Sequence, residues 1–199
     1  RWSPMEPSCT KNEVDVLIVG YVRGERATGT VTLVTTPEGR VILVDAGDPW
    51  NGAELRERLA ERGYAPEEMT DVLITHGHID HCGNVAMFAR ARFFMDGDWT
   101  EGGVYGQRQQ GRHPLTASVW IEQLAGHTPS DLVLVVSDCA RGGTTVVAGD
   151  LFEDGDDEAK WRANSQDCET HERSREYVRQ HADWIVPGHG DVFRVEKTQ

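Results

Sequence analysis

The stretch LITHGHIDHCGN, residues 73–84, sets three histidines and one aspartate within six positions, directly after an apolar run. His76 and His78 are two residues apart, so both side chains point to one face where the backbone is extended. Asp80 and His81 follow at once. Four such groups gain little from being packed side by side. The stretch therefore predicts a turn that holds something positively charged, and a metal ion fits that description.

The glycines in this stretch argue for a turn rather than a long helix. A helix would pair positions 76 and 80 on one face, as the zinc motif H-E-x-x-H pairs its two histidines. Gly77 lets the chain turn closely, and Gly83 closes the segment. We therefore expect Asp80 and His81 to lie on a bend that ends at Gly83.

Other groups that can bind a metal also stand where apolar runs stop. ILVD ends at Asp45, VVAGD ends at Asp150, and WIVPGH ends at His189. Strand ends that gather at one edge of a layered fold bring such groups together under covering loops. Seven candidate ligands are too many for one tetrahedral ion and suit two ions that share a bridge. They are His76, His78, Asp80, His81, His127, Asp150 and His189.

The sequence pattern predicts many strands with helices at intervals, in two similar halves. This arrangement indicates a layered fold that mixes strands and helices. Strands are expected at 14–22, 28–36, 40–45, 72–75, 92–95, 118–123, 131–137, 144–149, 184–186 and 191–195. Helices are expected at 51–63, with Asn51 as N-cap, Leu55 and Leu59 facing the core and Gly63 after its end, at 83–90, and at 157–182 as one or two polar helices. Turns are expected at 37–39 and 141–143, and a long polar loop, a possible lid, at 96–114.

Length and composition narrow the class of protein. A chain of 199 residues fits a single domain, 1–199, and we expect a domain excised from a longer chain because it begins at Arg1. The net charge of −13 argues against broad affinity for nucleic acid, although a local basic groove is compatible with it. No apolar run approaches the length of a membrane span, so no membrane association is expected. Four scattered cysteines (9, 82, 139, 168) predict reduced thiols in a cytoplasmic or nuclear protein.

Four motifs in order resemble those of the metallo-β-lactamase superfamily. They are H-x-H-x-D-H at 76–81, GHTP at 126–129, AGD at 148–150 and PGHG at 187–190. The resemblance covers nearly the whole chain and implies an α+β fold, the four-layer αββα sandwich, with the site at one edge of its two sheets. It assigns His76, His78 and His127 to a first metal and Asp80, His81 and His189 to a second. Asp150 bridges the two.

A closer resemblance points to one branch of that superfamily. The runs THGHIDHCGN and VVAGDLFEDGDDEAKW carry it, together with VPGHGDVFRV near the C-terminus. The described activity of that branch is endonucleolytic cleavage of histone pre-mRNA near its 3′ end, and the likeness also implies a homodimer. The sequence departs from the superfamily at Ala46, in VDAG, and at Ser130, which follows GHTP. Both positions adjoin ligands, so they bear on the substrate more than on the metals.

The expected chemistry is hydrolysis by a hydroxide held between two divalent ions, most simply zinc, with manganese or iron as alternatives. Zinc lowers the pKa of a bound water from about 15.7 to about 7. Asp80 and Asp150 are the expected catalytic carboxylates, and His113 is a candidate contact for the leaving group. Asp45 is expected to orient a ligand imidazole from behind, although a turn-capping role is equally compatible with its position.

Alternatives from other classes remain open at this point. One is a small-molecule hydrolase acting on an ester, thioester or lactone, like glyoxalase II, although only ten residues follow His189. A persulfide dioxygenase with a single iron is another, and a regulator that binds metal without turnover is a third. Cys82 is expected to pack as a small apolar group, and His171 and His181 are expected to be solvated. The acidic run 153–158 is expected to be a solvated surface, and Tyr105, Arg108 and Arg112 are candidates for gripping substrate.

Overall fold

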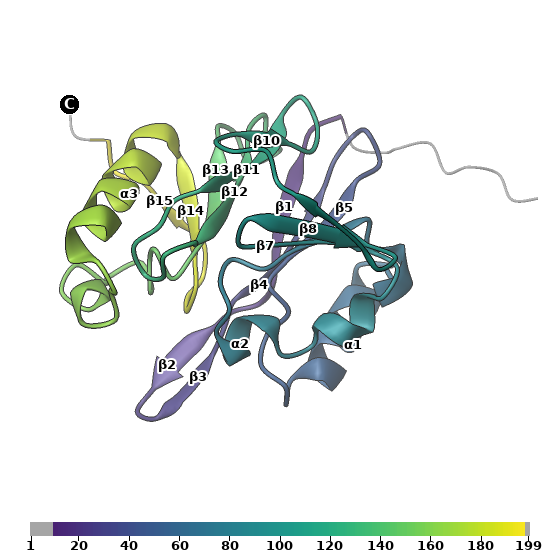
Figure 1. The fold of residues 1–199 in the computed structure, drawn as a ribbon, viewed down its shortest axis with the longest axis horizontal. Coiled ribbons are helices and arrows are strands. Elements are labelled where there is room, and N and C mark those ends of the chain that lie inside the picture. The colour runs from purple at the N-terminus through teal and green to yellow at the C-terminus, as the bar shows by residue number, and fades with distance from the viewer. Residues whose placement is uncertain (1–9, 198–199) are drawn as a thin grey trace, which may run out of the picture.

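Two β-sheets stacked face to face form the centre of the computed structural model, which describes residues 10–197 (Figure 1). The first sheet has the order β1-β4-β5-β6-β7-β8-β9 and the second the order β10-β11-β12-β13-β14-β15. The strands of the first sheet are β1 Glu13–Ile18, β4 Val31–Thr35, β5 Val41–Val44, β6 Asp71–Leu73, β7 Arg92–Met95, β8 Asp98–Glu101 and β9 Val104–Gln107. Those of the second are β10 His113–Pro114, β11 Val119–Gln123, β12 Leu132–Val136, β13 Thr145–Gly149, β14 Trp184–Pro187 and β15 Phe193–Arg194.

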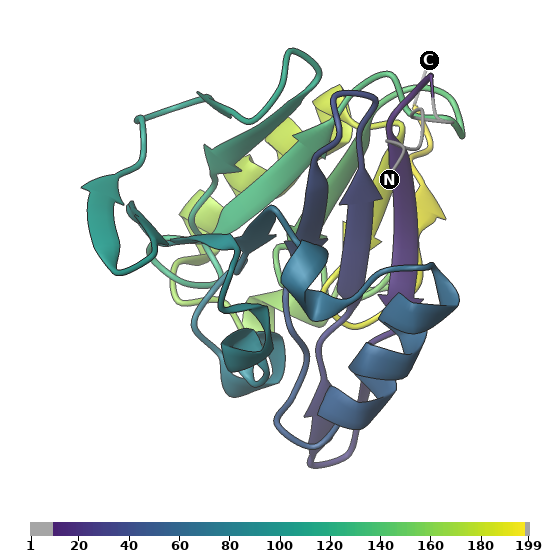
Figure 2. The ribbon, with the colours of Figure 1, turned by 90° about the vertical axis from the view of Figure 1, so that its right-hand side faces the viewer.

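One helix covers the outer face of each sheet, which gives the four layers. Helix α1 (Gly52–Glu61) lies across the first sheet, as Figure 2 shows, and α3 (Cys168–His181) lies on the far side of the second. Short helical turns complete the set of helices: α2 Ile79–Cys82, η1 Pro66–Glu68, η2 Val85–Phe88 and η3 Trp161–Ala163. The α+β, αββα sandwich expected from the sequence is confirmed.

The alternation of side chains along the strands explains why both faces of each sheet are buried. In β5, Ile42 and Val44 face the core between the sheets, whereas Leu43 packs with Leu55 and Leu59 of α1. Successive residues of a strand point to opposite faces, so a run of apolar residues covers both. The same alternation in β12 and α3 builds the other outer layer. There Leu132, Leu134 and Val136 face the central core, and Val133, Val135 and Val178 pack together outside it.

Strand directions bring the carboxyl ends of several strands to one edge. In the first sheet β5 and β6 are parallel, and in the second β13 and β14 are parallel. Strand β11 runs the same way as β13, because each is antiparallel to the β12 that lies between them. The residues that follow these strands therefore emerge on the same side within each sheet.

The first strand predicted from the sequence is wrong in extent. In place of one strand over 14–22, β1 ends at Ile18 and a separate hairpin follows, β2 Tyr21–Arg23 and β3 Arg26–Thr28. A Cβ at Gly20 would lie 2.6 Å from the Thr28 carbonyl oxygen and 2.7 Å from that of Gly188. Only glycine lets the three backbones approach this closely, and the chain changes direction there.

The loop predicted over 96–114 is largely a hairpin. Strands β8 and β9 pair from Asp98↔Gln107 to Glu101↔Val104, so the sheet continues where the sequence predicts a polar loop. Gly102 and Gly103 between them have φ of 57° and 84°. A two-residue turn with φ above zero at both positions is the favoured hairpin connection, and this glycine pair is the feature that could have identified it.

The short helix predicted over 83–90 is present only as the 3₁₀ turn η2, whereas the helix predicted over 51–63 is confirmed in position. Chain segment 79–88 instead forms the single turn α2 and the 3₁₀ turn η2. Asp80 and His81 thus lie on a short helical turn that ends at Gly83. Asn51 precedes α1 but makes no side-chain cap; its amide donates to Thr28 Oγ1 at 3.2 Å.

Two further expectations concern membranes and thiols. Among residues 10–197, no helix combines the length and apolar character needed to cross a bilayer. Cys82, Cys139 and Cys168 are free thiols, and Cys82 packs partly buried beside the α1 layer, as expected. Cys9 lies outside the described residues.

Candidate metal centre

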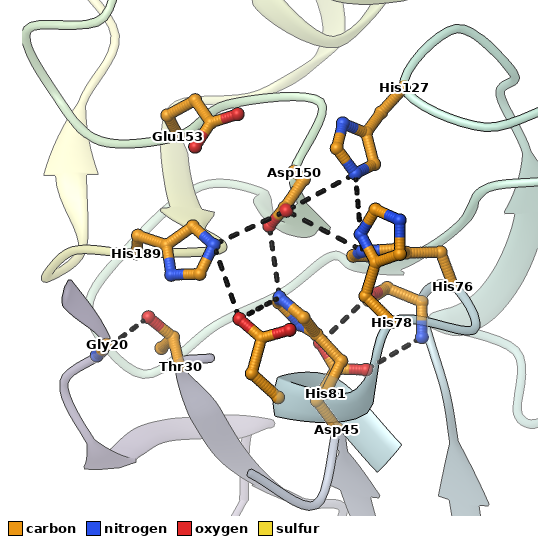
Figure 3. Close-up of polar contacts among 12 residues, drawn as sticks. Gly20, Thr30, Asp45, His76, His78, His81, His127, Asp150, Glu153 and His189 are labelled. Atoms are coloured by element: carbon orange, nitrogen blue, oxygen red, sulfur yellow. Dashed lines mark hydrogen bonds and ion pairs between the residues drawn. The ribbon is translucent and has the colours of Figure 1, made fainter. Parts of the chain in front are cut away.

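The structure brings all seven predicted ligands together at one edge of the sandwich, in two groups (Figure 3). The first group joins His76, His78, His127 and Asp150. His78 Nδ1 lies 2.9 Å from His76 Nε2 and 3.1 Å from His127 Nε2, and Asp150 Oδ2 lies 3.4 Å from His127 Nε2. Ligand atoms about 2.0 Å from a tetrahedral zinc ion lie about 3.3 Å from one another. This group is therefore spaced as a single cation requires.

The second group lies on the other side of Asp150. Asp80 Oδ2 is 3.8 Å from both His81 Nε2 and His189 Nε2. Asp150 Oδ1 is 3.2 Å from His81 Nε2, and Asp150 Oδ2 is 3.3 Å from His189 Nε2. Within the described part of the chain, Asp150 is thus the carboxylate in contact range of both groups, which is the position of a bridge between two ions.

Several polar atoms of this cluster lack hydrogen-bond partners within the described part of the protein and are placed where they could coordinate a cation. Among residues 10–197, His81 Nε2 and Asp150 Oδ1 are buried without a hydrogen-bond partner. The facing nitrogens of His76, His78 and His127 meet without an oxygen acceptor between them. Buried polar atoms that lack a partner cost free energy, and a cation coordinated by them removes that cost. The nitrogen and oxygen donor set, without cysteine, suits zinc, manganese or iron.

Asp45 orients one histidine of each group. Its Oδ2 accepts from His81 Nδ1 at 2.7 Å and from Thr75 Oγ1 at 2.9 Å. Thr75 Oγ1 lies 3.1 Å from His76 Nδ1, so the proton of that nitrogen is donated to the threonine. Both histidines therefore carry their proton on Nδ1 and turn Nε2 toward the centre. The carboxylate expected behind one ligand thus supports two.

Burial and neighbouring charges shift the pKa values of the buried histidines in opposite directions in the two groups. Burial lowers the pKa of His76 to about 2 and also lowers the pKa of His127. Burial opposes a charge on His81 and His189 too, but Asp150 outweighs it and raises the pKa of both, with help from Asp45 at His81. For Asp150, burial is outweighed by His81 and His189, which hold its pKa well below the usual value. Cations at the second group therefore compete with protons.

Two glycines provide space that the site requires. A Cβ at Gly188 would overlap Asp150 Oδ1, so any side chain there would occupy the position of the carboxylate. Gly149 has φ of 54°, and a Cβ there would lie 2.7 Å from Thr75, the residue that links Asp45 to His76. The PGHG motif thus leaves room for the carboxylate of Asp150, and the AGD motif leaves room for Thr75.

The loop that carries Asp150 is anchored from α3. Arg175 is 1% exposed, and its two Nη atoms donate to the carboxylate of Asp157 at 2.6 and 2.7 Å. Arg175 Nη1 also donates to the Leu151 carbonyl at 2.6 Å, and Asp157 Oδ2 accepts from the backbone N–H of Glu153 at 2.8 Å. A bidentate, buried ion pair thus fixes the residues that follow Asp150.

This anchor corrects two expectations from the sequence. The acidic run is not a uniformly solvated surface, because Glu153 and Asp157 are 5% and 2% exposed. His171 is fully buried rather than solvated, with Nε2 3.1 Å from the Leu151 carbonyl, whereas His181 is exposed as expected. The apolar positions of α3 are few, so its buried face carries polar residues and the sequence pattern conceals it.

Three of the four side chains predicted to contact substrate in the 96–114 region interact with other parts of the protein instead. His113 accepts from the Gln109 N–H at 3.2 Å, and its ring lies 5.3 Å from that of Phe94. The structure does not bring it into the metal-ligand groups, so its leaving-group role stays a prediction. Arg108 is buried and donates to Gln123, and Arg112 stacks on a tryptophan, whereas Tyr105 is exposed.

The αββα sandwich and the two groups of candidate ligands at its edge are typical of metal-dependent hydrolases. Comparison with known proteins supports this class. The sequence profile of the metallo-beta-lactamase superfamily matches residues 25–96. The chain belongs to the metallo-beta-lactamase superfamily. Within it, the chain is similar to metallo-beta-lactamase domain-containing protein 1 of Xenopus laevis, with 39% identity over 98% of this chain and 88% of the relative.

Solved structures share the fold at lower sequence identity. A Bacillus thuringiensis AiiA variant with N-decanoyl-L-homoserine bound at its active site superposes with a TM-score of 0.69 and 17% identity, over 90% of this chain and 92% of that one. AidC, described as a dizinc quorum-quenching lactonase, gives 0.62 and 15%, over 87% and 81%. At these identities the similarity shows the fold.

Proposed function

We propose that this chain is a hydrolase with two divalent metal ions that cleaves phosphodiester bonds in RNA. The observation that carries the hydrolase is Asp150 in contact range of two ligand groups, within distances that suit two cations. When bound, a pair of divalent cations supplies Lewis acidity and lowers the pKa of coordinated water toward neutrality. The RNA substrate is supported by the resemblance of the motif-bearing runs to the pre-mRNA-cleaving branch of the superfamily.

The side chains of the site differ in their exposure to solvent. His76, His81 and Asp150 are buried and hold fixed positions, whereas His78 is exposed and the Asp80 side chain is 22% exposed. Substrate therefore approaches from the side of His78 and Asp80. There the Asp80 carboxylate can accept a hydrogen bond from the attacking water and hold its proton away from the electrophile.

A cavity of about 460 Å³ beside His189 supports a second candidate. Its walls include Tyr21 and Val22 of the β2 strand, with Glu153, Asp154, Lys160 and Asn164 opposite. Its volume suits a small molecule. Lys160 is the one lysine among the lining residues and pairs with Asp154 at 2.8 Å, so a long anionic strand gains little charge attraction from it. This favours a small ester, thioester or lactone.

One substrate panel separates these candidates. Metal-reconstituted protein is assayed on a histone pre-mRNA 3′-end RNA, a phosphodiester reporter, a thioester and a lactone, beside Asp150→Asn and the exposed control Asp156→Asn. Our proposal predicts RNA cleavage that Asp150→Asn abolishes and Asp156→Asn keeps. RNA cleavage by Asp150→Asn at the wild-type rate would identify a contaminant, and cleavage of the lactone or thioester alone would select the second candidate.

The salt dependence of RNA binding tests the surface independently of turnover. The −13 charge and the single lysine in the cavity predict a shallow slope, about one or two phosphate contacts. A steep slope would reveal a basic surface that these features do not indicate. Two bound ions with no hydrolysis of any substrate would instead identify a metal-binding regulator.

A further inference from the structure

The buried ring of His171 has a nitrogen that the fold leaves without a partner. The ring lies on the inner face of α3, with its centre 4.6 Å from the Trp161 ring and 6.4 Å from the His127 ring. Its Nε2 faces the Leu151 carbonyl at 3.1 Å, and a carbonyl only accepts, so Nε2 carries the proton. Nδ1 is then an acceptor, and within residues 10–197 it is buried with no donor.

The neighbouring residue His127 has a ring N–H that lacks a hydrogen-bond acceptor among residues 10–197. Its Nε2 faces His78 and Asp150, so the proton of a neutral His127 ring lies on Nδ1, which Figure 3 shows turned away from the cluster. That Nδ1 is buried and has no protein acceptor within the described part of the chain. Ligand histidines nearly always donate this proton to an oxygen acceptor or a water, which fixes the ring.

The backbone holds these two rings at a fixed separation. A Cβ at Gly126 would lie 2.2 Å from His171 Cα, so α3 packs directly on the turn that precedes His127. The Ser174 hydroxyl also donates to the Ala125 carbonyl at 2.6 Å. Rings joined by a direct N–H···N bond have centres about 5 Å apart, since the two nitrogens are about 2.9 Å apart. The observed 6.4 Å exceeds that, so the two rings do not bond directly, and a single water is the simplest group that can join the donor to the acceptor at this separation.

We propose that His171 is a positioning residue for the first metal: its Nδ1 accepts, through one buried water, the Nδ1 proton of His127. This extends the proposed function and rests on it. The link satisfies both orphan nitrogens and fixes the orientation of the His127 ring. Because His171 also donates to the Leu151 carbonyl, it connects the His127 turn to the backbone that follows Asp150.

Two substitutions separate the roles of the two nitrogens. His171→Gln places an amide where Nε2 lies and keeps the bond to Leu151, but it removes the acceptor at Nδ1. His171→Asn keeps an oxygen near Nδ1 and loses the bond to Leu151. We expect His171→Gln to weaken binding of Zn²⁺ or Co²⁺ at the first site by about 10- to 100-fold in a chelator competition, whereas His171→Asn remains near wild type. The matched control is His181→Gln on the exposed face of the same helix.

The opposite order, or unchanged affinity in His171→Gln, would overturn the proposal. If either variant fails to fold, ¹⁵N NMR of the Zn²⁺-loaded wild type decides instead. It should show His171 protonated at Nε2 alone and a protected Nδ1 proton on His127 in contact with water. A proton on His171 Nδ1 would refute the link. If the wild type itself binds fewer than two ions, the proposed function fails rather than this inference.

Discussion

The two halves of the sandwich contribute the candidate metal ligands in different ways. The first half delivers His76, His78, Asp80 and His81 from one turn after β6, and one buried carboxylate, Asp45, supports it. The second half delivers His127, Asp150 and His189 from three separate strand ends, and α3 supports two of them through the Leu151 backbone and the 125–126 turn. A single carboxylate, Asp45, thus orients residues that come from one turn. The residues that come from separate strand ends are held by a whole helix, α3, through its buried polar side chains.

The largest effect is expected where the halves meet, at Asp150. In Asp150→Asn one oxygen becomes an amide that cannot coordinate a cation, so the bridge between the two groups is lost. We expect fewer than two bound ions and a loss of activity of about 10³-fold or more, equivalent to several kcal/mol of transition-state stabilisation. Elemental analysis and kinetics measure both, with Asp156→Asn as the control. Two bound ions at full activity would show that Asp150 does not bridge.

Breaking the support of the second half should be the next largest effect. Arg175→Met leaves Asp157 as a buried charge without its partner and is expected to reduce the free energy of unfolding by about 3–5 kcal/mol. Arg175→Met with Asp157→Leu should recover most of that loss, because the uncompensated charge is gone. Denaturant unfolding measures this, and Arg173→Met, at an exposed ion pair of the same helix, should change little. An Arg175→Met variant as stable as the wild type would show that this ion pair does not anchor the loop.

Breaking the support of the first half should affect metal binding more than stability. Asp45→Asn loses the charge that holds His81 and, through Thr75, His76, so both metals should bind about 10- to 100-fold more weakly. Thr75→Val interrupts only the His76 branch and should weaken the first site alone. Isothermal titration with a competing chelator distinguishes the sites. Equal weakening of both sites by Thr75→Val would contradict this division.

A difference in pH dependence between the two ligand groups is also expected. The raised pKa of His81 and His189 means that protons occupy the second group as pH falls, so its metal affinity should drop by up to about tenfold per pH unit for each proton displaced. His76, with a pKa near 2, and His127, with its lowered pKa, are already neutral and add little dependence at the first group. Titrations between about pH 8 and pH 6 test this. A first site that is the steeper of the two would reverse the assignment.

The sequence predicts much of this molecule, and the failures have physical causes. Alternating apolar strands predict the layers because the alternation is a local pattern, and the motifs H-x-H-x-D-H, GHTP, AGD and PGHG predict the seven candidate ligands. The sequence pattern does not predict the β2–β3 hairpin, because the close approach that requires glycine at position 20 involves the backbone of Gly188, far away in the sequence, as well as that of Thr28. The burial of His171 in α3 and of Asp157 in the acidic run is not predicted, because neither a polar helix nor a run of acidic residues gives a sign of burial in the sequence.

Anomalous diffraction from crystals of zinc-reconstituted protein, collected at the zinc absorption edge, would locate the bound ions themselves. We expect two peaks about 3.5–4 Å apart. One should lie among His76, His78 and His127 and the other among Asp80, His81 and His189, with Asp150 touching both. A single peak, or peaks away from these side chains, would contradict the two-ion site.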